Sequence, residues 1–210
     1  MLPLYDDRPK GRFPFATLLL ILLNLWVFLG WQLRVGIPES IEMGGMVPAE
    51  IMHSPSPDSF IHMAAAMFMH AGWMHILGNM WFLWIFGAGV EGVVGSGGFL
   101  LFYLLCGFFA GLTHVVLSPG SLLPMIGASG AISGVLGAYL ILHPGASIST
   151  FFFFRVIRVR AWFFLLFWIG FQILSQAAER PGQGGVAYLA HIGGFFSGLL
   201  LIFFFKKARR

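Results

Sequence analysis

Charged residues are scarce in this sequence. Lys, Arg, Asp and Glu make up 10% of its 210 residues, whereas hydrophobic residues make up 58% and the mean hydropathy is +0.86. A water-soluble domain of this size could not keep so much apolar surface away from water. The sequence also lacks the short segments of alternating polarity that are typical of membrane β-barrels. The composition therefore predicts an all-α, polytopic membrane protein.

Cysteine is nearly absent, and the acidic residues avoid the centres of the apolar segments. The single cysteine, Cys106, lies within an apolar segment, so the chain has no disulfide framework and we expect this residue to serve packing. No histidine is followed by glutamate, which excludes the His-Glu-x-x-His motif of zinc proteases. The paired membrane aspartates of an aspartyl protease are excluded too, because the aspartates are Asp6, Asp7 and Asp58. We expect no metal and no cofactor.

Six apolar segments are present, and most are long enough to cross a hydrocarbon core of about 30 Å as helices. They cover residues 14–33, 73–91, 97–117, 126–143, 158–177 and 186–205. We predict that residues 1–210 form a single membrane domain in which these six helices make one bundle. No small-residue cleavage site follows the first segment, so we interpret it as a retained helix rather than a signal peptide.

The basic residues predict the orientation of the helices. Cytoplasmic N- and C-termini would place ten of the twelve Lys and Arg residues on the cytoplasmic side, and leave Arg34 and Arg180 outside. The ten lie in three groups, at residues 8–12, 155–160 and 206–210. Because these groups flank apolar segments, we expect the lipid bilayer as a partner and no nucleic acid.

The longest connection, residues 34–72, would then lie outside. It contains prolines and acidic residues, but also many Met, Phe and Ile side chains. A loop this long and this apolar is not typical of a disordered segment. We expect it to lie partly in the membrane interface, with an ordinary long surface loop as the alternative.

Four polar residues interrupt the apolar segments near one side of the predicted membrane. His75 and Asn79 lie near the start of the second helix, Ser129 near the start of the fourth, and His191 near the start of the sixth. All three helices would begin at the outer face, and the four-residue spacing puts His75 and Asn79 on one helix face. Each residue alone could be structural, but polar groups in membrane helices are costly. Their joint placement favours a functional site.

These residue types are the parts of a serine hydrolase. A serine hydroxyl needs a base to become a nucleophile, and the neutral imidazole of His191 could be that base for Ser129. The His75 ring N–H, the Asn79 amide and the backbone N–H of Ser129 could stabilise an oxyanion. No carboxylate lies in the outer half of any predicted helix. We therefore expect a Ser–His dyad without an acid to orient the histidine.

Small residues surround this predicted dyad. Gly127 and Gly130 flank the serine, and we expect them to leave room for a substrate backbone and for the histidine. Gly194 and Gly198 form a small-x-x-x-small pattern in the sixth segment. This pattern predicts close packing of the sixth helix against the glycine-rich fourth.

Three motifs together resemble the rhomboid family of intramembrane serine proteases. They are His75-x-x-x-Asn79, Gly127-Ala128-Ser129-Gly130 and Ala190-His191-x-x-Gly194-x-x-x-Gly198. The resemblance extends over about residues 14–205 and implies a six-helix core that opens to water on the outer side. It implies cleavage of transmembrane protein substrates in or near their membrane segments. It also implies that Ser129 is the nucleophile, His191 the base, and His75 and Asn79 the oxyanion donors.

One position departs from part of that family. Some members carry an aromatic residue four positions after the serine, stacked on the catalytic histidine, whereas this chain has Ser133 there. Tyr188 or Phe195 could support the histidine instead. The glycines and proline of residues 179–186 predict a flexible connection that caps Ser129 and His191, with a passive surface turn as the alternative.

Two other functions were weighed against proteolysis. A catalytically silent rhomboid-like protein that binds or escorts membrane clients would have lost the serine or the histidine, and this chain has both. A small transporter would show inverted repeats or paired broken helices, and the segments show neither. The compact six-helix form suits a bacterial plasma membrane. The substrate and the oligomeric state stay open.

Overall fold

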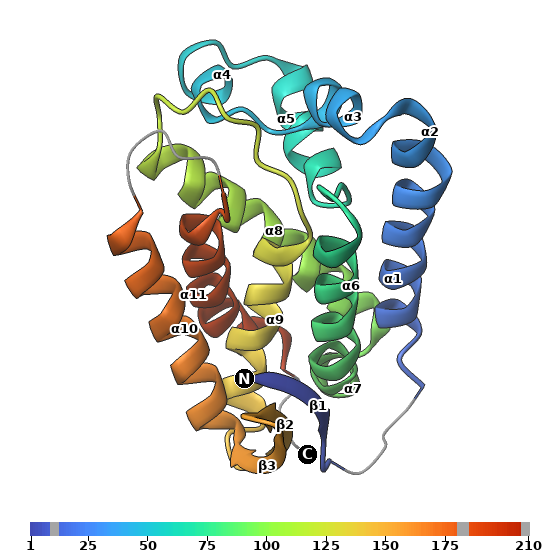
Figure 1. Ribbon diagram of the computed structural model, residues 1–210, viewed down its shortest axis with the longest axis vertical. Helices are drawn as coiled ribbons and strands as arrows, with labels where there is room; N and C mark the ends of the chain where they lie inside the picture. The colour runs from blue at the N-terminus through green and yellow to red at the C-terminus, as the bar shows by residue number, and fades with distance from the viewer. Residues whose placement is uncertain (9–12, 180–184, 207–210) are drawn as a thin grey trace.

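The computed structural model describes residues 1–8, 13–179 and 185–206. Figure 1 shows a bundle of long helices with short helices across one end and a small sheet at the other. The short helices are α3 (Ile37–Gly44), α4 (Pro48–His53) and α5 (Pro57–Ala66). We call their end of the bundle the outer end and the sheet end the inner end.

Five helical spans are long and apolar enough to cross a membrane. The first span joins three consecutive helices, α1 (Phe15–Val27), the π-helical η1 (Phe28–Gln32) and α2 (Leu33–Val35). The last two spans are single helices, α10 (Ala161–Ala178) and α11 (Tyr188–Phe205). The others are α8 (Ser96–Leu117) and a span that joins α6 (Trp73–Phe82), the π-helical η2 (Leu83–Gly87) and α7 (Ala88–Val94). The chain is therefore a multi-pass membrane protein.

The remaining long helix, α9 (Ser129–Leu142), is shorter and lies at the centre of the bundle. It has 14 residues, about 21 Å at 1.5 Å per residue, and every residue from Gly130 to Tyr139 is buried. The six long helical stretches begin and end within a few residues of the predicted segments, whereas α3, α4 and α5 lie in the connection of residues 34–72, where no helix is predicted. Whether α9 makes a sixth crossing stays a prediction, because its length falls short of a full span.

Backbone-to-backbone packing joins α9 to α11. A Cβ atom added to Gly198 would lie 2.6 Å from the Cα of Gly134, and one added to Gly194 would lie 3.0 Å from the carbonyl carbon of Gly130. No side chain larger than hydrogen fits at either position without movement of a helix backbone. The glycines thus set the distance between these two helices.

A buried carboxylate connects three helices at the inner end of the bundle. Glu91 of α7 accepts hydrogen bonds from the backbone N–H groups of Ala16 and Thr17, at 2.9 and 2.8 Å, and from the hydroxyls of Thr17 and Ser96. The first N–H groups of a helix have no partner within the helix, so the carboxylate caps α1. This single side chain ties α1 and α8 to α7.

A three-stranded antiparallel sheet is the main departure from the all-α expectation. Its strands are β1 (Leu2–Asp6), β2 (Ser147–Phe152) and β3 (Arg155–Arg160), in the order β1-β2-β3. Between its three arginines β3 contains Val156, Ile157 and Val159, and such β-branched residues favour a strand. The helix predicted from residue 158 therefore begins only at Ala161.

The inner end also holds a polar cluster beneath α9. Asp6 accepts a hydrogen bond from the Tyr139 hydroxyl at 2.6 Å and pairs with Arg8. The Arg8 guanidinium bonds the same hydroxyl and lies 4.8 Å from the centre of the Tyr139 ring. Beside this cluster the backbone N–H of Ser147 holds the pKa of Asp7 below its usual value. These contacts dock β1 onto the end of the central helix.

The close approach of α9 and α11 gives the first prediction. Gly198→Ala should lower the free energy of unfolding by about 1–3 kcal/mol, because its methyl group must overlap the backbone of α9. Gly170→Ala in α10 is the matched control, since nothing lies within 4 Å of a Cβ atom there. Thermal unfolding in detergent micelles measures both variants. Equal stability of the two would show that α9 and α11 are not held together by this glycine contact.

Candidate active site

Three helices bring the predicted site residues together at the outer end of the bundle. Figure 1 shows the connection from α8 descending into the bundle to the start of α9, and α9 begins at Ser129. Gly127 fixes this descent: its N–H donates to the carbonyl of Ala66 at 2.8 Å, and its φ of +122° suits glycine. His75 and His191 lie in the first turns of α6 and α11.

Ser129 and His191 are joined by a hydrogen bond. The Ser129 Oγ and His191 Nε2 atoms lie 2.7 Å apart, and the histidine is only 8% exposed. The other ring nitrogen, Nδ1, donates to Gln172 Oε1 at 2.8 Å. Because the proton of a neutral ring is then on Nδ1, Nε2 is free to accept the serine proton. This is the tautomer that a general base requires.

Gln172 is a site residue that the sequence did not identify. It lies on α10 and is 6% exposed. No carboxylate orients the histidine ring among the described residues; the neutral amide oxygen of Gln172 accepts a hydrogen bond from it instead. A single glutamine in an apolar helix gives no motif, so only its spacing from His191 in three dimensions reveals it.

Aromatic rings also support the histidine. The Trp168 ring lies 5.9 Å from the His191 ring at an interplanar angle of 36°, and the Tyr188 ring meets it edge-on at 6.5 Å. Phe195 lies beside Trp168 at 6.2 Å. The stacking that an aromatic residue at position 133 could provide thus comes from α10, while the Ser133 hydroxyl donates to the carbonyl of Ser129 at 2.6 Å.

Two side-chain donors lie on α6. The backbone N–H of Ala71 donates to His75 Nδ1 at 3.3 Å, so the proton of the neutral ring is on Nε2. That nitrogen lies 2.8 Å from where a Cβ atom of Gly127 would be, so only glycine leaves it space beside the serine loop. Asn79 is buried, and its Nδ2 has no hydrogen-bond partner among the described residues. Both groups can donate to an oxyanion.

The start of α6 is held by a second histidine. His70 is fully buried. The Gln32 side chain accepts a hydrogen bond from the backbone N–H of His70 at 2.8 Å and donates one to its backbone carbonyl at 3.1 Å. Burial, aided by the neighbouring His75, lowers the pKa of His70 to about 3. The His70 ring therefore stays neutral and packs edge-on against His75 at 5.0 Å without placing a charge beside it.

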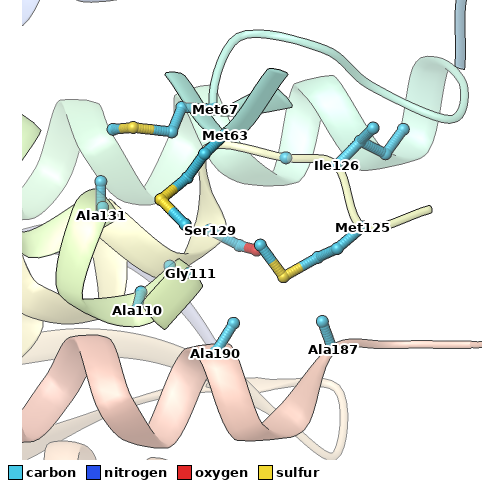
Figure 2. A pocket seen from close by; sticks show the side chains of 13 residues that line it. Met63, Met67, Ala110, Gly111, Met125, Ile126, Ser129, Ala131, Ala187 and Ala190 are labelled. Atoms are coloured by element: carbon cyan, nitrogen blue, oxygen red, sulfur yellow. The ribbon is translucent and has the colours of Figure 1, made fainter. Parts of the chain in front are cut away.

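A small cleft opens beside the serine. Figure 2 shows Met63 and Met125 near Ser129, with Ala187 and Ala190 facing them from the start of α11. The rest of the lining is small or apolar, and includes Gly107, Ala110, Gly111, Gly130 and Ala131. An extended peptide backbone with apolar side chains fits such a lining.

The flanking glycines have separate roles in this geometry. Gly130 packs against Ala110 of α8, whose Cβ would lie 2.7 Å from an added Cβ, and Gly194 packs against the Gly130 backbone. Gly198 contacts α9 one turn further down. The predicted cap depends on residues 180–184, which lie outside the described residues. Among those described, no three His, Cys, Asp or Glu side chains are grouped to hold a metal ion.

Comparisons with known proteins find one family. The model of the Rhomboid domain matches residues 57–208. The chain is 36% identical to Rhomboid protease GluP of Bacillus subtilis over 134 residues and 30% identical to Rhomboid protein 1, mitochondrial, of Saccharomyces cerevisiae over 154 residues. These alignments cover 63% and 71% of this chain but only 24% and 43% of the relatives.

Another relative is named as an inactive protein. The chain is 30% identical over 98 residues to Inactive rhomboid protein 1 of Drosophila melanogaster, which covers 47% of this chain and 7% of the relative. Similarity to relatives of both kinds leaves the chemistry to be argued from the site itself.

The Gln172 contact gives the second prediction. Gln172→Leu should slow the reaction of Ser129 with a fluorophosphonate by on the order of a hundredfold, because the imidazole loses its orientation. Gln172→Glu should restore much of the rate and move the acidic limb of the pH–rate profile to higher pH, because a carboxylate at Nδ1 stabilises the protonated ring. Gln176→Leu, one turn along α10, is the control. Unchanged pH profiles and rates in both Gln172 variants would mean that the amide has no part in positioning the ring.

Proposed function

The chain belongs to the rhomboid family, and from this we propose that it is an intramembrane serine endopeptidase with a Ser–His dyad. Its substrates would be membrane proteins, cut in or near their transmembrane segments. The observation that carries the proposal is the 2.7 Å hydrogen bond between Ser129 Oγ and His191 Nε2. A partly buried serine and a buried histidine from different helices meet with the donor and acceptor that acyl transfer needs.

In the proposed reaction the peptide carbonyl carbon is attacked by Ser129 Oγ. His191 Nε2 takes the hydroxyl proton as the new C–O bond forms, and then gives it to the leaving amine as the C–N bond breaks. Gln172 keeps the Nδ1 proton pointed away from the serine throughout. Water, activated by the same nitrogen, then hydrolyses the acyl-enzyme and releases the second product.

The negative charge of the tetrahedral intermediate needs donors already in place. His75 Nε2–H and the unpartnered Asn79 Nδ2–H₂ lie on α6, and the backbone N–H of Ser129 is at the start of α9, where the helix leaves such groups free. In an apolar site these fixed dipoles stabilise charge far more than they would in water. They are the oxyanion donors of the proposed mechanism.

The location of the site favours a substrate whose transmembrane helix is locally unwound where it leaves the lipid. The cleft beside Ser129 is lined by thioether side chains and by glycine and alanine, so it accepts extended backbone with apolar side chains. We propose that the chain crosses the membrane six times, with both termini cytoplasmic, and that it resides in a bacterial plasma membrane. The distribution of basic residues and the similarity to the Bacillus subtilis protease support this location.

A second function is a catalytically silent membrane protein that binds or escorts clients. The similarity to an inactive rhomboid protein is the observation in its favour. The hydrogen-bonded Ser129 and His191 pair argues for the protease, since a silent protein has no need of it. The measurements below separate the two functions.

The third prediction tests the dyad. Ser129→Ala and His191→Ala should each abolish cleavage of a model transmembrane substrate by the purified chain, because nucleophile and base act as a unit. A fluorophosphonate should label the wild-type chain at Ser129 and fail to label either variant. Ser133→Ala is the control for labelling at the wrong serine. Substrate cleavage by purified Ser129→Ala, or an unlabelled wild-type chain that still binds clients, would overturn the proposal.

The fourth prediction separates the oxyanion donors from the dyad. His75→Ala and Asn79→Ala should each lower kcat by roughly ten- to a thousandfold, since one such donor contributes a few kcal/mol to transition-state stabilisation. Fluorophosphonate labelling of Ser129 should persist at a reduced rate, which shows that the fold and the nucleophile are intact. If kcat were unchanged in both variants, backbone N–H groups alone would stabilise the oxyanion.

A further inference from the structure

The tip of the β2–β3 hairpin holds two phenylalanines in an unfavourable backbone conformation. Phe153 and Phe154 have φ angles of +44° and +64°. This left-handed region suits Gly and Asn, which are the usual residues of two-residue hairpin turns. The two side chains are also 78% and 92% exposed. These bulky apolar residues lie in a turn conformation that disfavours them, and no other part of the described chain buries them. They therefore point to a role other than stabilising the fold.

The apolar surface continues from the tip over one face of the sheet. Leu2, Phe151 and Val156 pair across the three strands, so their side chains lie on the same face, and all three are exposed. The opposite face is buried against the bundle through Ile148 and Thr150. The sheet thus presents a contiguous apolar patch, which is typical of a contact surface.

Positive charge lies directly beside this patch. Arg155, Arg158 and Arg160 of β3 are all exposed. Arg160 donates to the carbonyl of Gly145 at 2.6 Å, whereas Arg155 and Arg158 form no ion pair with a carboxylate in the described part of the chain. Two guanidinium groups that no described carboxylate pairs with therefore lie on the strand that follows the phenylalanine tip.

The sheet lies at the inner end of the bundle, where β3 ends at Arg160 and α10, a helix long and apolar enough to cross a membrane, begins at Ala161. The Trp81 indole N–H, on a span that can cross the membrane, donates to the carbonyl of Pro3 in β1 at 2.6 Å. Figure 1 shows the sheet at the inner end, beside α7 and the start of α10. Apolar side chains next to arginines match this zone, because acyl chains and phosphate groups adjoin there.

We propose that the hairpin is an anchor for anionic phospholipids. Phe153 and Phe154 insert at the edge of the hydrocarbon layer, and the guanidinium groups of Arg155 and Arg158 bind the phosphates of the surrounding headgroups. The exposed turn then has the environment that its side chains require. This anchor is separate from the proposed proteolysis, and its test uses no substrate.

The depth of the tip is measured on a nitroxide attached to Phe154→Cys in a Cys106→Ala background, in vesicles of phosphatidylcholine with one quarter phosphatidylglycerol. The label should collide more often with oxygen, which concentrates in lipid, than with a water-soluble nickel chelate. A label at Gly145→Cys, at the base of the same hairpin, should show the reverse. A tip label that collides more often with the nickel chelate would show that the tip lies in water. A nitroxide spectrum broadened by a second label nearby would show that the tip contacts a second copy of the chain, and either result would overturn lipid insertion.

The choice of lipid is measured on the unlabelled chain by native mass spectrometry from mixed micelles. The wild-type chain should retain phosphatidylglycerol in preference to phosphatidylcholine. Arg155→Gln with Arg158→Gln should reduce that preference by about fivefold for each arginine, and the double lysine variant should keep it. Equal preference in the wild-type and glutamine chains would overturn the anionic-lipid assignment.

Discussion

The contact between the backbones of α9 and α11 is the constraint on which the site depends. Ser129 and His191 begin these two helices, and a hydrogen bond of 2.7 Å between them requires helix axes closer than ordinary side chains permit. Glycine at positions 130, 134, 194 and 198 makes that approach possible. Packing within about the first three turns of each helix therefore determines the geometry of the site at the helix starts.

The second constraint on the site is electrostatic. A carboxylate beside His191 would have to be kept ionised among apolar side chains, at a large desolvation cost. Gln172 orients the same nitrogen through a neutral oxygen, and Trp168 holds the face of the ring. In contrast, the buried Glu91 accepts hydrogen bonds from four donors at the inner end, and the start of α1 supplies three of them. The charge is thus placed away from the proposed chemistry, and the site itself is built from neutral groups.

Much of the bundle and the placement of Ser129, His191, His75 and Asn79 could be predicted from the sequence, because long apolar runs and polar residues within them are local signals. Other features have no local signal. Gln172 gains its meaning only from a contact across two helices. The run of phenylalanines before Arg155 merges with neighbouring apolar residues, so its turn and strands were hidden. β1 pairs with residues far along the chain, and sequence periodicity cannot reveal such a partner.

The pairing of Leu2 with Phe151 has a consequence for the order of assembly. The sheet cannot be completed until the chain through β3 has been synthesised, so β1 stays without its partner strand while α1 to α9 are made. Asp6 then reaches Tyr139 only after α9 is in place. The pairing of β1 with β2 thus joins an early segment of the chain to a late one, and it holds these two segments together at the inner end.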